Sequence, residues 1–339
     1  MQKGLVSVLT PCYNTAHLVS RLLDSVVLQT YPSIEMFIID DGSTDNLREI
    51  CESYRIRFEK KGYCLIYIHQ ENQGQSVAIN NGLKLINGEY LVWPDSDDFY
   101  ASNDAIEKMV FRLNDAQDDC AIVRSMTRVL DEHNLSEIKI LGQSSKEIED
   151  KSMFVDCLFN RNGFYFGAGS YMVKVDALKK VSGMSIYTHQ KAGQNWQIFL
   201  PILYSYRCIT IKEPLYNVLQ REASHSRDGN KGYEKQLLLL KVYEKTIIET
   251  LNRIVAMPRN ECAQYSELVS IKYSYERLML AYNCRKRKDF IKEYSKLTTI
   301  TDNISLKYKI YRYSVMFKIE PLADFIILIF RKVKCCLVR

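Results

Sequence analysis

Residues 34–45 read IEMFIIDDGSTD, a β-type run that leads directly into a turn with three aspartates. Residues 89–98 read EYLVWPDSDD and repeat this arrangement, with a short apolar run followed by three more aspartates. Aromatic and β-branched residues bounded by Asp, Gly and Ser are typical of strands that end in turns. Both stretches therefore predict a strand with an acidic carboxyl end.

The surrounding residues extend this pattern. Two more strands are predicted at 5–10 and 64–69, and helices are predicted between the strands at 18–27, 43–60 and 76–86. Ser43 or Thr44 is the expected N-cap of the second helix, and Asn87-Gly88 is the expected left-handed end of the third. Strands that alternate with helices favour parallel pairing through right-handed crossovers. The sequence therefore predicts an α/β fold with a parallel sheet.

Beyond residue 100 the signals are weaker. The predictions there are a helix, a strand, a polar loop and a second strand, at 104–113, 121–129, 131–151 and 171–175. After Gly232 no glycine occurs and Leu, Lys, Tyr and Glu dominate, which predicts a helical region. A domain boundary is expected near Asn230.

Composition and charge narrow the class of protein. The 339 residues are 47% hydrophobic and 25% charged, as in ordinary globular proteins, and ten cysteines show no C-x-x-C pair. Met1 is followed by polar residues and no signal peptide is recognised, so a reduced, cytoplasmic protein is expected. From Lys231 onward the chain has 22 Lys and Arg against 11 Asp and Glu, while the whole chain carries only +6. The basic part of the chain from Lys231 onward is expected to contact an anionic surface, either lipid or nucleic acid, or to be a solvated helical face.

The end of the chain favours lipid as that surface. The apolar run Phe325 to Phe330 is too short to span a bilayer, and the basic residues Arg331, Lys332 and Lys334 follow it. This pattern suits a helix in the interface of an anionic leaflet, with added attraction from Arg285 to Lys288, although the run could instead pack on the protein. A peripheral position on the inner face of the cell membrane is therefore expected.

The two acidic turns predict a metal site. Ligands of open parallel sheets bind at the carboxyl ends of the strands, where 40–45 and 95–98 are expected to converge. Carboxylates gathered at one edge repel each other unless a hard cation compensates them, so Mg²⁺ or Mn²⁺ is predicted, holding a diphosphate. Taken singly, each turn is a weak signal: 40–45 could be an acidic turn followed by a helix cap, and 95–98 a solvated loop.

Five stretches occur in the order and spacing of a known family: VSVLTPCYN at 6–14, LQTYP at 28–32, DDGSTD at 40–45, ENQGQSVAINNGL at 71–83 and GEYLVWPDSDD at 88–98. Over residues 4–230 the chain resembles an inverting family 2 glycosyltransferase of the bacterial surface-polysaccharide kind. The resemblance implies a Rossmann-like GT-A catalytic domain at 1–230, with a nucleotide-binding half at 1–100 and an acceptor half at 101–230. Residues 231–339 would form a helical, basic C-terminal region.

The resemblance also implies roles for single residues. Pro11 and Tyr13 would border the nucleotide base, and Asp40 would accept a hydrogen bond from it. Asp97 would bind the metal, and Asp95 would lie near the ribose or the metal. The other implied nucleotide-binding residues are Thr10, Asp41, Asn72, Gly74, Asn80, Ser96 and Arg221, with Ser76 in the same donor-lining segment.

The chain departs from the family at two places. Ile79 stands where many relatives carry an arginine that contacts phosphate. Gly193-Gln194-Asn195-Trp196 stands where the family shows Glu-Asp, whose Asp is the general base. Because an amide cannot accept a proton at working pH, either Asn195 marks a weakly required base or His189, six residues upstream, supplies it. Otherwise Asn195 is a helix N-cap and His189 an ordinary loop histidine.

Residues 221–227, REASHSR, resemble the family's basic loop that closes over the diphosphate. Arg221 or Arg227 would pair with phosphate, and His225 would join the metal shell. A polar linker into the helical region is the alternative for this segment.

The function that follows is transfer of a sugar, a hexosyl or N-acetylhexosaminyl group, from a nucleotide-sugar donor to a saccharide or lipid-linked saccharide acceptor in polysaccharide biosynthesis. A non-catalytic module that binds sugar nucleotides or membranes is the alternative that Asn195 leaves open. A nucleotidyltransferase is disfavoured because residues 10–14, TPCYN, contain no glycine for a phosphate loop. No nucleic-acid partner is expected, since the basic region lacks a recognised binding motif.

Overall fold

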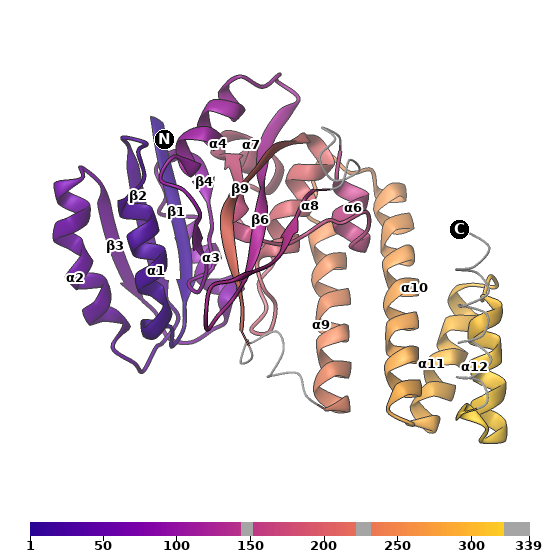
Figure 1. The fold of residues 1–339 in the computed structure, drawn as a ribbon. Helices are drawn as coiled ribbons and strands as arrows, with labels where there is room; N and C mark the ends of the chain where they lie inside the picture. The colour runs from indigo at the N-terminus through magenta and orange to yellow at the C-terminus, as the bar shows by residue number, and fades with distance from the viewer. Residues whose placement is uncertain (144–151, 222–231, 322–339) are drawn as a thin grey trace. The chain divides into compact units, whose positions relative to one another are not determined.

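The computed structural model describes residues 1–143, 152–221 and 232–321 (Figure 1). The chain forms two compact units. The first unit comprises Met1–Glu222 and Thr246–Cys262, and the second comprises Ala223–Lys245 and Ala263–Arg339. The expected domain boundary near Asn230 stays a prediction.

The first half of unit 1 is a parallel sheet (Figure 1). Its strands are β1 (Gln2–Cys12), β2 (Ile34–Asp40), β3 (Cys64–His69) and β4 (Gly88–Val92), in the order β3-β2-β1-β4. All three neighbouring pairs are parallel. The four predicted strands and their parallel pairing are therefore confirmed.

Beyond β4 the sheet becomes mixed. The order continues β8 (Tyr171–Lys174), β6 (Cys120–Asp131), β9 (Arg207–Gln220) and β5 (Phe99–Tyr100), with β7 (Glu137–Leu141) paired to β6. β8 is antiparallel to both β4 and β6, whereas β9 runs parallel to β6. The prediction of a loop over 131–151 is wrong for β7, which is an antiparallel partner of β6; residues 144–151 lie outside the described residues.

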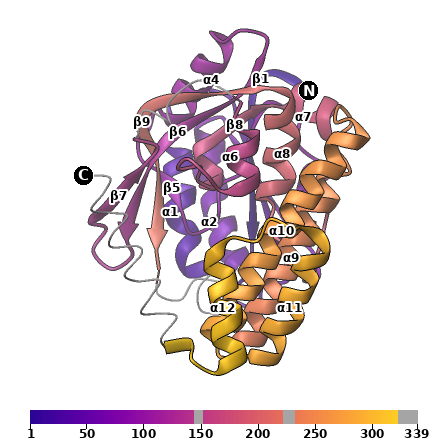
Figure 2. The same ribbon diagram turned by 90° about the vertical axis from the view of Figure 1, so that its right-hand side faces the viewer.

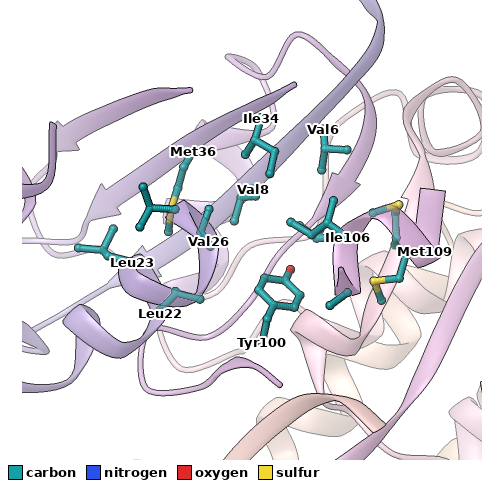
Figure 3. Packing of buried hydrophobic residues seen from close by; sticks show 14 of the residues in the cluster. Val6, Val8, Leu22, Leu23, Val26, Ile34, Met36, Tyr100, Ile106 and Met109 are labelled. Atoms are coloured by element: carbon teal, nitrogen blue, oxygen red, sulfur yellow. The ribbon is translucent and has the colours of Figure 1, made fainter. Parts of the chain in front are cut away.

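Helices connect the strands of the parallel half. They are α1 (Ala16–Val27), α2 (Leu47–Lys60) and α3 (Gln75–Gly82), and α4 (Ala105–Asn114) follows β5. Figure 1 shows α1 and α2 side by side. Buried residues of α1, α2 and α4 belong to one cluster with the alternate residues Val6 and Val8 of β1. Figure 3 shows those of α1 and α4 around the two valines. Leu9, on the other face of β1, contacts Gly82 of α3, so helices cover both faces.

Two predicted helix ends are wrong. The N-cap position of α2 is Asn46, because Ser43 and Thr44 are used elsewhere: Ser43 Oγ accepts a hydrogen bond from the backbone N–H of Asn14, and the N–H of Thr44 donates to Asn14 Oδ1. α3 ends at Gly82 rather than Ile86. Gly88 begins β4, and its N–H donates to Ser7 Oγ at 2.9 Å, so a side chain there would collide with Ser7.

The remaining helices of unit 1 are α6 (Phe154–Phe159), α7 (Val175–Ser182) and α8 (Asn195–Ser205), with a short 3-10 helix, η1 (Ala168–Ser170), before β8. α8 is buried on most sides, since Phe199 packs on the rings of Trp93 and Tyr171. This aromatic packing fixes the N-terminal end of α8, where Asn195 lies.

The predicted helical region after Gly232 is confirmed for the described residues. Its helices are α9 (Tyr233–Leu251), α10 (Arg259–Asn283), α11 (Arg287–Ile300) and α12 (Leu306–Phe317). Figure 2 shows α11 and α12 side by side, and Leu278, Phe290 and Tyr311 belong to one buried cluster of unit 2. None of the helices in the described part of the chain is both long and apolar enough to cross a membrane.

Candidate functional site

The two acidic turns lie at one edge of the parallel sheet. In the register of the strands, Asp40 at the end of β2 is opposite Cys12 of β1 and His69 of β3. Burial, with smaller contributions from Cys51 and Asp40, raises the pKa of the Cys12 thiol. The Gly74 N–H donates to Asp41 of the first turn, and Nε2 of the next residue, Gln75, donates to Asp95 of the second turn, so the two turns lie close together. Ser96 of the second turn is buried.

Asp40 is a buried carboxylate held by three donors. Its Oδ2 accepts hydrogen bonds from Tyr67 Oη and from His69 Nδ1 at 2.9 Å, and its Oδ1 accepts from the Ser43 N–H at 2.8 Å. Burial acts to raise the pKa of Asp40, but the hydrogen bonds from Ser43, Tyr67 and His69 outweigh it and lower the pKa. A carboxylate has about four acceptor positions, so Oδ1 retains one for a further donor.

Asp41 shapes the loop that follows β3. Its Oδ1 accepts from Gln70 Nε2 at 2.7 Å and from the Gln73 N–H at 2.9 Å, and its Oδ2 accepts from the Gly74 N–H at 2.8 Å. Gly74 has a φ of +95° and meets the backbone of Gln190 so closely that a Cβ would collide with it. These contacts fix the segment that carries Asn72.

The same segment positions residues 186–189. Ser76 Oγ accepts from the His189 N–H at 3.0 Å and donates to the His189 carbonyl at 2.9 Å. Asn80 Oδ1 accepts from the Ile186 N–H at 2.9 Å. Ile79, at the position of the family's arginine, is fully buried and does not face a ligand. Ser76 and Asn80 therefore hold the chain segment that precedes Asn195.

The ring of His189 is already engaged. Its Nδ1 accepts a hydrogen bond from the Lys191 N–H at 3.1 Å, so in the neutral ring the proton is on Nε2. A neutral imidazole has one lone pair available to accept a proton, and here that lone pair is used. The general-base role of His189 stays a prediction, and this geometry does not favour it.

Asn195 and Gln194 present two buried amide oxygens. Asn195 is the first residue of α8 rather than its N-cap, and its Nδ2 lies 3.5 Å from the Phe166 carbonyl. Within the described residues, neither Asn195 Oδ1 nor Gln194 Oε1 has a hydrogen-bond partner. Unpaired buried acceptors are costly, so these oxygens suit a donor that comes from outside the chain, such as a water or a substrate hydroxyl.

The turn after β4 concentrates negative charge. Asp95 Oδ1 accepts from Gln75 Nε2 and from Gln194 Nε2, each at 3.1 Å. Burial and the nearby carboxylate of Asp97 raise the pKa of Asp95 to about 7. Asp98 Oδ1 accepts from the Leu219 N–H at 3.0 Å, and burial, Asp97 and Asp95 together raise its pKa. The local negative charge is therefore incompletely compensated.

The carboxylate oxygens at this edge fit a hard divalent cation whose shell is completed by phosphate and water. Asp97 and Asp95 supply carboxylate oxygens, and a cation beside them would favour the charged form of Asp95, whose pKa is raised by burial and by repulsion from Asp97. No group of three or more His, Cys, Asp or Glu side chains within the described residues is arranged to hold a metal by itself. Mg²⁺ is bound in proteins by one or two carboxylates with phosphate and water completing its shell. His225 and Arg227 lie outside the described residues.

The structure places the other predicted residues around this edge. Thr10 and Pro11 lie in β1, and Thr10 Oγ1 is buried with no hydrogen-bond partner among the described residues. Tyr13 follows β1 and is exposed, as a side chain that borders a base must be. Arg221 follows β9 and pairs with Asp97.

Four residues that contact the site were not predicted: Tyr67, His69, Gln75 and Gln194. Tyr67 and His69 are two residues apart on β3, so the period of a strand would have placed them on one face. No local signal marks Gln75 and Gln194 as partners of Asp95, because 99 residues separate Asp95 from Gln194.

Comparison with known proteins gives the family. The model for glycosyl transferase family 2 matches residues 7–180. The glycosyltransferase GlyA of Streptococcus pneumoniae is 37% identical over 117 residues, which cover 34% of this chain and 16% of GlyA. TuaG of Bacillus subtilis, named as a candidate teichuronic acid biosynthesis glycosyltransferase, is 38% identical over 108 residues, or 32% of this chain and 41% of TuaG. Each match spans less than half of the relative.

Two solved structures share the fold. TarS of S. aureus, in complex with UDP-GlcNAc, gives a TM-score of 0.55 at 16% identity, covering 93% of this chain and 92% of that one. The mannosyltransferase PcManGT of Pyrobaculum calidifontis, in complex with GDP-Man and Mn²⁺, gives 0.52 at 16% identity, covering 94% and 86%. The described fold is thus of the GT-A type, with a helical C-terminal region. Because the family model matches more than half of its length, this chain belongs to glycosyl transferase family 2.

Proposed function

We propose that this chain is a glycosyltransferase that moves a sugar from a nucleotide-diphosphate sugar to a saccharide acceptor in polysaccharide biosynthesis. The observation that carries the proposal is the convergence of the two acidic turns, where the adjacent residues Gly74 and Gln75 donate hydrogen bonds to Asp41 and Asp95. The complexes of TarS with UDP-GlcNAc and of PcManGT with GDP-Man support a nucleotide-sugar donor, and the name of TuaG supports a polysaccharide product.

Different residues would bind different parts of the nucleotide-sugar donor. Asp40, kept ionised by its three donors, would accept the remaining hydrogen bond from an N–H of the base beside Pro11 and Tyr13. Asn72 and Gly74, fixed by Asp41, would border the donor. Arg221 would place its guanidinium on the diphosphate, since a planar guanidinium pairs with phosphate through two hydrogen bonds.

Metal dependence is part of the proposal. Asp97, with Asp95 beside it, would hold Mg²⁺ or Mn²⁺, and the Mn²⁺ in the PcManGT complex supports this. The ion, when bound, would neutralise the charge of the departing diphosphate. The transferred group would be a hexosyl or an N-acetylhexosaminyl group.

Asn195 would act on the acceptor. Its buried, unpaired Oδ1 would accept a hydrogen bond from the acceptor hydroxyl and orient it, with Gln194 Oε1 as a second acceptor. An amide orients a hydroxyl without taking its proton. Inversion at the anomeric carbon, which the family resemblance implies, would then need the proton to leave through water or another group.

The acceptor proposed here is saccharide, free or lipid-linked, and the chain would work in the cytoplasm, peripherally on the inner face of the cell membrane. The expected membrane segment, Phe325 to Phe330, lies outside the described residues. The basic charge of the C-terminal region supports an anionic surface as partner.

A non-catalytic sugar-nucleotide-binding module is the second candidate. It is favoured by two observations at the position of the family's base: Asn195 is an amide, and the Nδ1 lone pair of His189 is engaged by Lys191. Such a module would bind the donor with metal and never turn it over.

Calorimetric titration with UDP-GlcNAc, UDP-glucose and GDP-mannose, with Mn²⁺ and with EDTA, tests the proposal. At least one donor is expected to bind with Mn²⁺ and to lose most of its affinity in EDTA. Release of nucleoside diphosphate from that donor in the presence of acceptor saccharides separates the enzyme from the module. The donor part of the proposal is overturned if no nucleotide sugar binds under either condition.

A further inference from the structure

One face of α12 presents large apolar side chains to solvent. Their exposed fractions are 69% for Leu306, 59% for Tyr313, 53% for Met316, 68% for Phe317 and, just after the helix, 44% for Ile319. Tyr311 and Val315 of the same helix belong to the buried cluster of unit 2. The helix is therefore docked through one side, and the exposed residues form its opposite face.

The spacing makes this face a continuous stripe. Tyr313, Met316 and Phe317 are three and four residues apart, and Leu306 lies seven residues before Tyr313, so all of them fall on one side of an α-helix. Lys309, also exposed, lies within the same stripe. Isolated exposed apolar residues are ordinary, but a contiguous group marks an interaction surface.

The charge around the stripe is mainly positive, although the exposed Asp302 lies four residues before Leu306. Residues 303–319 contain Lys307, Lys309, Arg312 and Lys318 and no Asp or Glu. The next acidic residue, Glu320, is buried, and both of its carboxylate oxygens pair with Arg287, at 2.6 and 3.0 Å. No carboxylate within the stripe therefore compensates its positive charge.

A second basic cluster borders the end of the stripe. The pair between Arg287 and Glu320 joins the start of α11 to the segment after α12, and the hydrogen bond from Tyr282 Oη to the Glu320 carbonyl at 3.0 Å joins that segment to the end of α10. Arg285, Lys286, Arg287 and Lys288 are all exposed at that point. The apolar end of the stripe thus lies beside Arg285, Lys286 and Lys288, while Glu320 compensates the charge of Arg287.

We propose that this stripe, formed by Leu306, Tyr313, Met316, Phe317 and Ile319 with the flanking lysines and arginines, docks on the surface of an anionic lipid bilayer. Apolar side chains of interfacial helices insert at the boundary between headgroups and acyl chains, while Lys and Arg remain among the headgroups. Each basic residue near an anionic surface adds to the electrostatic attraction. An anionic bilayer matches both properties of the stripe, whereas a nucleic acid would match only its charge.

This inference deepens the proposed function, on which its biological meaning rests, by naming the surface that would bring the chain to a lipid-linked acceptor. It does not depend on residues 322–339. The stripe and both basic clusters belong to unit 2.

The test is cosedimentation of the full chain with vesicles of phosphatidylcholine alone and of phosphatidylcholine with phosphatidylglycerol. The wild-type chain is expected to bind the anionic vesicles at least tenfold more tightly, with affinity falling as salt rises. Phe317→Glu is expected to lower that affinity at least tenfold, because it places a carboxylate in the apolar stripe. The matched control is Phe111→Glu, since Phe111 on α4 is 69% exposed and lies outside the stripe.

Equal binding by Phe317→Glu and the Phe111→Glu control overturns the proposal, as does a wild-type chain that ignores anionic lipid. A salt-dependent complex with duplex DNA that forms in preference to vesicles and is unchanged in Phe317→Glu also overturns it. Circular dichroism confirms that both variants are folded, and calorimetric donor binding is measured on the same samples. If the wild-type chain binds the donor but not the anionic vesicles, the proposed membrane surface alone is wrong. If it binds the vesicles but no donor, the proposed function alone is wrong.

Discussion

A terminal nitrogen of the Arg221 guanidinium lies 2.6 Å from Oδ2 of Asp97. Asp97 follows β4 and Arg221 follows β9, and nearby the Leu219 N–H donates to Asp98 at 3.0 Å. The end of β9 is thereby fixed on the acidic turn. Arg221 supplies positive charge at the place where a diphosphate and its cation are proposed to bind, so the pair must reorganise when they do.

Replacement of Arg221 by Ala should therefore have opposite effects on metal binding and on donor binding. Without the arginine, Asp97 loses its cationic partner, so Mn²⁺ alone is expected to bind several-fold more tightly to the free protein. The nucleotide sugar is expected to bind about tenfold more weakly, because its diphosphate loses a charge-assisted partner. Calorimetry with Mn²⁺ alone and with donor measures both.

Arg207→Ala is the control for this experiment, since Arg207 pairs with Asp119 at 2.7 Å on the exposed surface of unit 1. It should change neither affinity. Weaker Mn²⁺ binding in Arg221→Ala would contradict the competition between the arginine and the ion.

Asn195 and His189 can be told apart as residues that act on the acceptor. Asn195→Ala removes the unpaired Oδ1, so turnover is expected to fall about tenfold with donor affinity unchanged. His189→Ala removes a ring whose lone pair is already used, so turnover is expected to change less than about threefold.

Steady-state kinetics over a range of pH provide the measurement. If His189→Ala instead abolished turnover and removed the acidic limb of the pH profile, His189 would be the base and the hydrogen bond from Lys191 would have to open during the reaction.

Unit 2 contains a buried ion cluster that makes its stability depend on pH. Arg277 Nε donates to Glu293 at 3.0 Å, Lys296 donates to the other oxygen at 3.0 Å, and Arg277 also pairs with Glu244. Burial acts to raise the pKa of Glu293, but its hydrogen bonds with Arg277 and Lys296 outweigh this and lower it. A lowered pKa in the folded state means that the stabilisation is complete above the unfolded value, about 4.3, and is lost as the pH falls through the folded value.

Glu293→Gln should accordingly lower the free energy of unfolding of unit 2 by about 3 kcal/mol at pH 7 and by less at pH 3, which lies below the unfolded value of about 4.3. Urea denaturation at both pH values, followed by circular dichroism, measures this. The same loss of stability at pH 7 and pH 3 would rule out the ion cluster as its cause.

The sequence predicted the elements whose signals are local. β3 was placed at its observed ends, 64–69, because six β-type residues are bounded by polar ones, and the acidic turns were placed because each follows a strand. The sequence does not predict β7, because Glu137, Ile138 and Lys139 are exposed and give no strong apolar pattern. The strand forms through its pairing with β6. The predicted end of α3 is wrong because Gly88 does not cap the helix. It begins β4, where its N–H donates to Ser7, 81 residues away.

In the site, too, sequence motifs indicate some residues, whereas contacts between distant parts of the chain could not be predicted. Asp40 and Asp97 were identified from their motifs, but the donors that hold Asp40 and Asp95 come from neighbouring strands and loops. Gln194, which donates to Asp95, follows the 186–189 segment that Ser76 and Asn80 hold. No pattern in the sequence indicates such a long-range contact.

Sugar transfer by Asp97→Asn, measured with Mn²⁺ and the donor that binds best, tests the central claim most directly. The amide keeps the size of the side chain and removes the charge, so the variant is expected to fold normally and to lose at least about 100-fold in turnover, with Mn²⁺ no longer stimulating the residual rate. Turnover equal to that of the wild-type protein, with the same dependence on Mn²⁺, would contradict the assignment of this acidic edge as the place where donor and cation bind.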